Sequence, residues 1–212
     1  MEVQMLKLYT AAGSCSTACH IALQEAGIPF ESKLVEFDTG FFDSKDFLSA
    51  NPKGYVPFLE IGQGRTLTEG AAIMQYVAEQ APEKNLMPTK GFERFKALEW
   101  LNFVATELHK PMGSLFMAET LVPDATARGH FVETVTQMLK ARFDFINTKL
   151  DGNNFLMGEQ YCIADGYLFT ILSWAKHLKI DLSAYKNIVN FQNKVYERPA
   201  TQRAFKAEGL LN

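Results

Sequence analysis

Hydrophobic and polar positions follow two different rhythms along the chain, and the change falls near residue 82. Before it, short runs with a period of two alternate with segments whose apolar residues recur every three to four positions. These patterns predict strands over residues 6–9, 30–37, 56–61 and 65–68, and helices over 16–26 and 69–80. Residues 38–50 are mostly polar with a few aromatic anchors, which indicates a loop containing a short helix.

The order of these elements predicts how they pair. The second strand follows the first through a helical crossover, so the two should be parallel. The turn GQG at 62–64 returns the chain, so the third and fourth strands should be antiparallel. A β-α-β unit followed by a hairpin and a closing helix is typical of a thioredoxin-like domain. Pro57 stands at a strand start, where no ladder N–H is needed, and its peptide bond can be cis.

The rest of the chain has a helical pattern throughout. Helices are predicted over residues 92–120, 125–151, 163–178, 182–196 and 200–206. The segment 163–178 is almost wholly apolar, so it should be a buried central helix. The fold class is therefore an α/β thioredoxin-like N-terminal domain plus an all-α C-terminal domain. We expect domains at 1–82 and 92–212, joined by a Pro-punctuated linker at 83–91.

Composition narrows the class of protein. The chain has 212 residues, of which 47% are hydrophobic and 21% charged, so it can bury a sizeable core. The net charge is −3 and no basic block stands out, so nucleic acid is not expected as a partner. Three cysteines make no disulfide framework, and neither a signal peptide nor a membrane-spanning run is visible. We expect a cytoplasmic protein that does not bind membranes.

Cys15 is the first candidate for chemistry. It follows the first strand and a small-residue turn, and it stands where the helix 16–26 should begin. The free N–H groups and the dipole of a helix N-terminus favour a thiolate over a thiol. The position therefore suggests a sulfur nucleophile or thiol binder. The alternative is a small buried residue at a strand–helix junction.

Several motifs in order make the chain resemble one family. They are GSCS at 13–16, NPKGYVP at 51–57, LTEGAAIMQY at 67–76, EWLNF at 99–103, TELHK at 106–110 and IADGYLF at 163–169. Together they resemble the bacterial beta-class glutathione S-transferases over nearly the whole chain. The resemblance implies the glutathione S-transferase fold, glutathione as substrate, a homodimer, a role in detoxification, and no metal.

The resemblance also implies roles for residues of the first half. Cys15 would face the glutathione sulfur and form a mixed disulfide with it. Val56, before a cis-Pro57, would offer its backbone to the cysteinyl part, as in β-augmentation. Glu69 and Gly70 would bind the charged γ-glutamyl end at a helix start. The alternatives are an ordinary strand-start proline and an acidic residue that only complements the helix dipole.

In the second half the resemblance points to one long helix. Asn102 and His109 are seven residues apart, which is two helical turns, so both should project from one face. The resemblance implies that they point towards the bound thiol across the domain cleft, and that His109 helps hold the thiolate. Glu107 is a weaker candidate, as a contact reaching a partner subunit. The alternative for His109 is a structural histidine.

The sequence departs from the family pattern near the site. The loop after the second strand lacks the lysine that reaches the glycyl carboxylate, for which Lys45 or Lys53 are possible substitutes. Tyr55 replaces a usual Gln. Cys162 replaces the Ser/Thr cap that pairs with Asp165, so it should be a buried structural thiol. His20 should be structural or lie at the cleft wall, and the expected apolar liners of the cleft are Met112, Phe116, Trp174 and His177.

The predicted function is a glutathione transferase that conjugates glutathione to small hydrophobic electrophiles. The enzyme would hold the glutathione thiolate and bring the electrophile into line for attack by sulfur. Two alternatives stay open. One is a glutathione-dependent thiol-disulfide oxidoreductase acting through Cys15. The other is a non-catalytic ligand-binding or partner-binding protein on the same fold.

Overall fold

The computed structural model describes residues 5–211, apart from the side chain of residue 38. Its contacts divide the chain into two compact units. The N-terminal unit runs to Thr89 and also takes in the segment from Glu197 onward, and the helical unit is Lys90–Tyr196. The sequence-based division put that last segment in the helical domain. It joins the N-terminal unit because helix Pro199–Ala207 packs on helix Ser16–Ala26.

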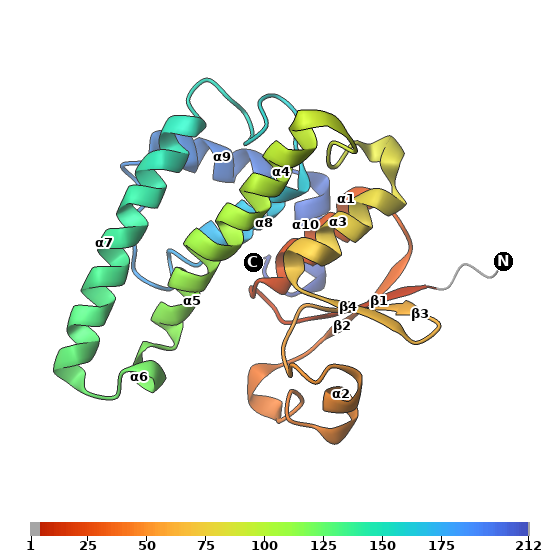
Figure 1. Cartoon of the computed structure of the whole chain (residues 1–212), viewed down its shortest axis with the longest axis horizontal. Coiled ribbons are helices and arrows are strands. Elements are labelled where there is room, and N and C mark those ends of the chain that lie inside the picture. The colour runs from red at the N-terminus through yellow and green to blue at the C-terminus, as the bar shows by residue number, and fades with distance from the viewer. Residues whose placement is uncertain (1–4, 212) are drawn as a thin grey trace. The chain divides into compact units, whose positions relative to one another are not determined.

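The N-terminal unit is built on a four-stranded mixed sheet (Figure 1). Its elements are β1 (Leu6–Thr10), α1 (Ser16–Ala26), β2 (Phe30–Leu34), η1 (Phe37–Thr39), α2 (Lys45–Ala50), β3 (Phe58–Gly62), β4 (Arg65–Thr68), α3 (Gly70–Gln80), η2 (Pro82–Lys84) and α10 (Pro199–Ala207). The strand order is β2-β1-β3-β4, with β1 parallel to β2 and antiparallel to β3, and β3 antiparallel to β4. The thioredoxin-like prediction is confirmed.

Helix α1 lies at the centre of the packing in this unit. It contacts β1, α3 and α10, and most of its residues are buried, which explains its largely small and apolar sequence. It ends at Gly27, whose φ of 66° lies in the left-handed region that glycine adopts without strain. In Figure 1, α1 and α3 cover one face of the sheet and α2 lies on the opposite side.

Two strands are shorter than the alternating pattern predicts. β2 ends at Leu34 instead of residue 37, and it lies at the exposed edge of the sheet, where only β1 supports it. β3 begins at Phe58, because the Val56–Pro57 peptide is cis and Pro57 has no N–H for the ladder. The loop between β2 and β3 is held by Phe41, Phe42 and Phe47, whose rings contact one another.

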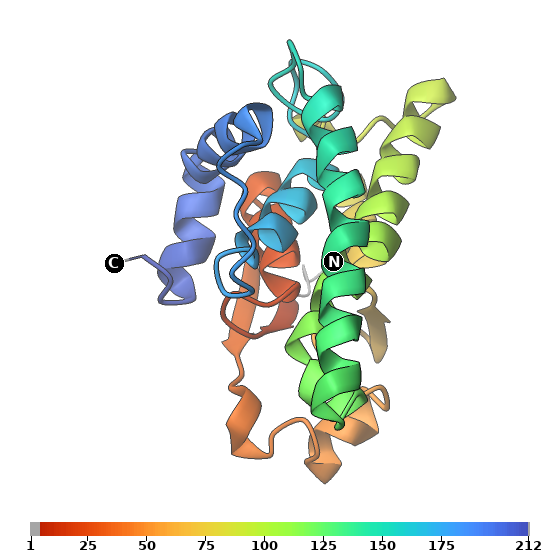
Figure 2. The same ribbon diagram turned by 90° about the vertical axis from the view of Figure 1, so that its left-hand side faces the viewer.

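The helical unit surrounds a buried central helix, α8, as predicted. Its elements are α4 (Gly91–Phe103), the π-helix η3 (Val104–His109), α5 (Lys110–Phe116), α6 (Ala118–Leu121), α7 (Ala125–Lys149), α8 (Ile163–Ser173) and α9 (Lys186–Tyr196). Residues Ile163 to Leu172 of α8 are all buried. Figure 2 shows the long helix α7 beside α4 and α5. The single helix predicted over 92–120 is instead α4, η3, α5 and α6 in succession.

Asp165 joins the start of α8 to the preceding loop. It accepts hydrogen bonds from the backbone N–H of Cys162 at 2.7 Å and of Leu156 at 2.8 Å. Cys162 is buried, so the prediction of a structural thiol is confirmed, and burial raises the pKa of this thiol well above its ordinary value. No helix in the described part of the chain is long and apolar enough to cross a membrane.

Candidate functional site

Cys15 lies at the N-terminal end of α1, as predicted, with its side chain half-buried. The turn before it is short, and the helix begins at the next residue. Its Sγ makes no capping bond and instead donates to the carbonyl oxygen of Val56 at 3.6 Å. A backbone carbonyl has a second lone pair, so this contact leaves Val56 able to accept another hydrogen bond. The structure thus brings together the candidate thiol and the candidate peptide-binding backbone.

The cis-Pro57 predicted from the sequence is present. Beside it, Gly70 opens α3, and a Cβ placed on Gly70 would lie 3.7 Å from Pro57 Cγ and 3.7 Å from Cys19 Sγ. The Cys19 thiol donates to the Gly70 carbonyl at 3.7 Å, which ties the start of α3 to α1. The first turn of α1, the cis-proline turn and the start of α3 therefore meet at one place in the N-terminal unit.

Glu69 caps α3 in an unusual conformation. Its φ is 67°, a region that costs a non-glycine residue energy and that clusters at functional positions. Its Oε1 accepts from Lys53 Nζ at 2.6 Å and from Tyr55 Oη at 2.9 Å, and Lys53 also donates to Thr68 Oγ1 at 2.9 Å. All four residues therefore form a polar cluster at the N-terminus of α3.

The cluster also shifts two ionisation equilibria. The hydrogen bond to Glu69 raises the pKa of Lys53, and partial burial followed by the same carboxylate raises the pKa of Tyr55. Lys45 and Lys53 are the two candidates to replace the missing lysine, and the two are separated in the fold: Lys45 opens α2, whereas Lys53 is bound at Glu69. Lys53 thus lies at the N-terminus of α3.

His109 lies in the helical unit at the end of the π-helix. Its Nδ1 is 2.6 Å from Tyr167 Oη, and its ring meets the Trp174 ring edge-on at a centroid distance of 5.2 Å. Phe116 in turn packs on Trp174, with centroids 5.5 Å apart. A π-helical segment is frequent at functional positions. His109 is therefore fixed by α8 among aromatic rings.

The expectation that Asn102 and His109 share a face is wrong. An i→i+5 turn takes more residues than an α-helical turn, so seven residues across η3 do not complete two turns. Asn102 is exposed and donates to the Leu98 carbonyl at 2.9 Å, whereas His109 contacts α8. The segment Val104–His109 itself contains no proline or glycine, but Pro111, two residues later, has no N–H to donate and so disturbs the regular α-helical hydrogen bonding.

Two other predicted residues of this unit have clear positions. Glu107 Oε2 accepts from Arg142 at 2.8 Å and 3.1 Å, which holds its carboxylate against α7. Met112 is fully buried in the helical unit, so its prediction as a wall residue is wrong. Phe116 and His177 are exposed, and Trp174 is mostly buried. Among the apolar candidates, Trp174 therefore lies beside His109, and Phe116 packs against the Trp174 ring.

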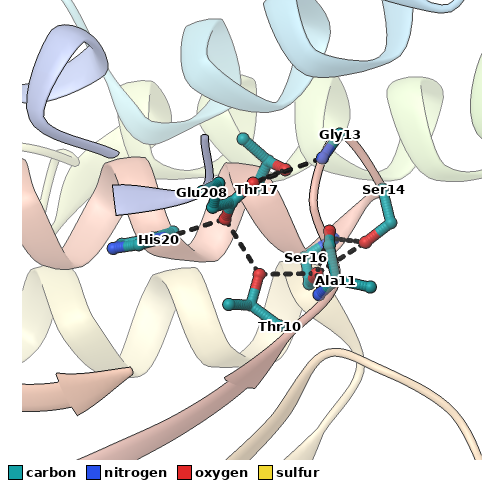
Figure 3. A network of polar contacts seen from close by, with 8 residues as sticks. All are labelled: Thr10, Ala11, Gly13, Ser14, Ser16, Thr17, His20 and Glu208. Atoms are coloured by element: carbon teal, nitrogen blue, oxygen red, sulfur yellow. Dashed lines mark hydrogen bonds and ion pairs between the residues drawn. The ribbon is translucent and has the colours of Figure 1, made fainter. Parts of the chain in front are cut away.

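Glu208 is the residue near the site that sequence reasoning missed (Figure 3). Its carboxylate accepts from Thr10 Oγ1 at 2.9 Å, Thr17 Oγ1 at 2.7 Å and the Gly13 N–H at 3.3 Å, and it lies 2.8 Å from His20 Nδ1. All of these groups come from the end of β1, the turn and α1, which together carry Cys15. The prediction that His20 is structural is confirmed. No local pattern links Glu208 to residues almost two hundred positions earlier.

Two further observations concern the buried thiol of Cys19 and the capacity to bind a metal ion. Burial raises the pKa of Cys19 well above its ordinary value, so this thiol is a poor nucleophile. Within the part of the chain that the structure describes, no three His, Cys, Asp or Glu side chains are grouped so as to hold a metal ion.

Comparison with known proteins agrees with this architecture. The family model described as "Glutathione S-transferase, N-terminal domain" matches residues 4–79, and that described as "Glutathione S-transferase, C-terminal domain" matches residues 103–199. The glutathione S-transferase GstA of Escherichia coli O157:H7 is 39% identical over 207 residues, covering 97% of this chain and 100% of that protein.

Solved structures give the same result. BphK, a bacterial glutathione S-transferase solved as a ternary complex, is 42% identical with a TM-score of 0.87, covering 96% of this chain and 100% of its own. A beta-class glutathione S-transferase of Sphingomonas chungbukensis and a sphingomonad glutathione S-transferase in complex with glutathione are each 35% identical with a TM-score of 0.86, covering 97% of this chain and 100% of their own.

A thioredoxin-like unit followed by a helical unit matches the N-terminal and C-terminal domains of the glutathione-dependent transferases. The chain belongs to the glutathione S-transferase family and is of the bacterial beta-class type. Its activity is that of a glutathione transferase, with glutathione as the substrate that supplies the sulfur.

Proposed function

We propose that glutathione binds along the N-terminal unit with its sulfur beside Cys15. The observation that carries this proposal is the meeting of Cys15 Sγ, the Val56 carbonyl and Pro57 with the start of α3. The backbone of Val56 would pair with the cysteinyl part of the tripeptide. Glu69 would accept from the α-ammonium, and the N–H groups at Gly70 would bind the α-carboxylate.

We further propose that His109 donates a hydrogen bond to the glutathione sulfur and stabilises its thiolate. The contact of Nδ1 with the Tyr167 hydroxyl fixes the orientation of the imidazole, and our proposal assigns Nε2 as the donor to the sulfur. Glu107 would contact the glutathione site of a partner subunit, whereas Asn102, which does not share a face with His109, is given no role at the sulfur. The thiolate then attacks the electrophile and displaces its leaving group, or adds to its double bond.

The second substrate is a small hydrophobic electrophile. The ring of Trp174, which contacts His109, and the ring of Phe116, which packs on Trp174, support this class, because flat apolar molecules stack on such rings. Bacterial relatives and free cysteines suit a cytoplasmic detoxification enzyme in a bacterium. The large exposed side chains of α4 and α7 support a homodimer: Phe92 is 73% exposed and Phe95 65% exposed.

A second activity, thiol-disulfide exchange through Cys15, is favoured by one observation. The half-buried Cys15 lies beside the proposed sulfur position, where it could attack the mixed disulfide of glutathione and a substrate thiol. A thiolate at Cys15 would form a mixed disulfide with glutathione and release the substrate thiol. A second glutathione thiolate would then attack that mixed disulfide, giving glutathione disulfide and the free Cys15 thiolate.

Two variants separate these activities. Cys15→Ala should keep conjugation of glutathione to a chlorodinitrobenzene and lose reduction of a mixed disulfide of glutathione. His109→Ala should lower kcat/KM for conjugation by about tenfold to a hundredfold, because one hydrogen bond to a developing charge is lost. Conjugation unaffected by His109→Ala would contradict its assigned role. A folded protein without glutathione binding at millimolar concentration would contradict the proposed site as a whole.

A further inference from the structure

We propose that Lys53 binds the α-carboxylate of glutathione's γ-glutamyl group, so that Lys53 and Glu69 together recognise an amino-acid zwitterion. This inference rests on the proposed glutathione site and names a specificity residue that the family resemblance does not assign. It starts from the Lys53–Glu69 ion pair, in which Nζ lies 2.6 Å from Oε1 at the N-terminus of α3.

The pair is held in place by its neighbours. Thr68 Oγ1 accepts from Lys53 at 2.9 Å, and Tyr55 Oη donates to Glu69 Oε1 at 2.9 Å. The Lys53 ammonium also lies 5.9 Å from the centre of the Tyr55 ring. Both charged groups remain accessible, with the Lys53 side chain 45% exposed and that of Glu69 61% exposed. The pair is thus oriented and still open to a ligand.

The charges of the pair mirror those of the ligand. The γ-glutamyl group carries an α-ammonium and an α-carboxylate on one carbon, so the two charges lie side by side. When this group binds, Glu69 exchanges the Lys53 ammonium for the ligand ammonium, and Lys53 turns to the ligand carboxylate. Every charge keeps a partner of opposite sign, so the exchange avoids leaving an unpaired charge.

The start of α3 explains why a lysine is useful here. Gly70 offers an N–H group to a carboxylate but has no side-chain donor. A nearby ammonium supplies the missing charged donor. Since the Lys53–Glu69 pair is neutral, it should also discriminate against ligands that bear only a cation or only an anion at this end, whereas Glu69 alone would attract any cation.

The test measures by calorimetry how the protein and its Lys53 and Lys7 variants bind two ligands. Glutathione carries both charges, and γ-aminobutyryl-cysteinyl-glycine lacks only the α-carboxylate. Lys53→Met should weaken glutathione binding by about threefold to tenfold, as expected for a partly exposed charged contact. For the analogue, Lys53→Met should bind within about twofold of the wild type. The analogue has no α-carboxylate for Lys53 to contact, so losing the Lys53 ammonium as well should cost little more.

A matched control is available in the same unit. Lys7 also forms an exposed ion pair, with Glu31 at 3.2 Å, and Lys7→Met should leave the affinity for both ligands unchanged. Lys53→Arg keeps the charge and should retain most of the glutathione affinity.

The outcomes distinguish this inference from the proposed function. Wild-type protein that binds neither ligand would overturn the glutathione site itself. Wild-type protein that binds glutathione, with Lys53→Met binding it equally well, would overturn only the assignment of Lys53. Equal losses for both ligands would overturn it as well, since they would indicate that Lys53 acts through Glu69 or the loop and not through the carboxylate.

Discussion

At the scale of single residues, the three cysteines have different environments despite identical chemistry. Cys15 is half-buried, whereas Cys19 and Cys162 are buried and burial raises the pKa of both thiols well above the ordinary value. Since the thiolate is the reactive form, the two buried thiols should be inert at neutral pH. Iodoacetamide should therefore label one cysteine per native chain, at Cys15, and three after denaturation, as mass spectrometry would show. Labelling of Cys19 in the native protein would contradict this reading.

The Tyr167 hydroxyl is a second residue-scale feature with a measurable effect. Tyr167 is buried and its hydroxyl lies 2.6 Å from His109 Nδ1, so it should fix the orientation of the imidazole that we propose as the donor to the glutathione sulfur. Tyr167→Phe should lower kcat for conjugation by about fivefold to tenfold with little change in the KM for glutathione. Tyr185→Phe, which keeps the ring packed on Phe143 in the same unit, serves as the control. Equal kcat values for the two variants would exclude this positioning role.

At the scale of elements, the sequence was most informative where one pattern decided the structure. Helix α1 has its predicted bounds because a strand, a small-residue turn and Gly27 delimit it, and α8 was identified by its unbroken apolar run. β2 was predicted too long because alternation continues past the point where its partner strand ends. The π-helix η3 was missed because its own residues have ordinary helical preferences, and the one local signal, Pro111, lies beyond its end.

For the candidate site, the sequence predicted the residues that lie in contiguous motifs but not the contacts between distant segments. The cis bond before Pro57 and the place of Cys15 followed from motifs that are contiguous in the chain. The contacts of Lys53 and Tyr55 with Glu69 join the ends of a loop and a hairpin, so no short window of sequence contains them. Glu208 lies farther still from its partners. Such contacts depend on the three-dimensional fold and leave no periodic signal.

Glu208 gives a prediction at the scale of elements, because it fastens the turn before α1. Glu208→Gln would replace a buried carboxylate, which accepts from three donors, by an amide whose NH2 group faces some of those donors. The free energy of unfolding should fall by about 2–4 kcal/mol. Urea denaturation measures this loss, with the exposed Glu197→Gln as control. A loss below about 0.5 kcal/mol, the usual range of surface substitutions, would show that the network is not a major stabilising element.

At the scale of the whole molecule, the exposed aromatic residues of α4 need an explanation. Phe92 and Phe95 lie on the first turns of this helix and are 73% and 65% exposed, and Phe145 and Met138 of α7 are also exposed. Rings of Trp100, Phe103 and Phe145 link the two helices into one face. An apolar face of this kind favours association, because burying each ring removes a large hydrophobic surface from water.

If this face forms the homodimer, replacing its rings should weaken the dimer without unfolding the chain. The double variant Phe92→Ser/Phe95→Ser should raise the dimer dissociation constant by about a hundredfold or more, since burying an aromatic side chain contributes roughly 1.5–3 kcal/mol. Sedimentation velocity over a dilution series measures this shift, and circular dichroism checks the fold. Leu121→Ser, which alters a similarly exposed side chain outside this face, should leave association unchanged. A double variant that stays dimeric at the concentrations where the wild type does would place the interface elsewhere on the chain.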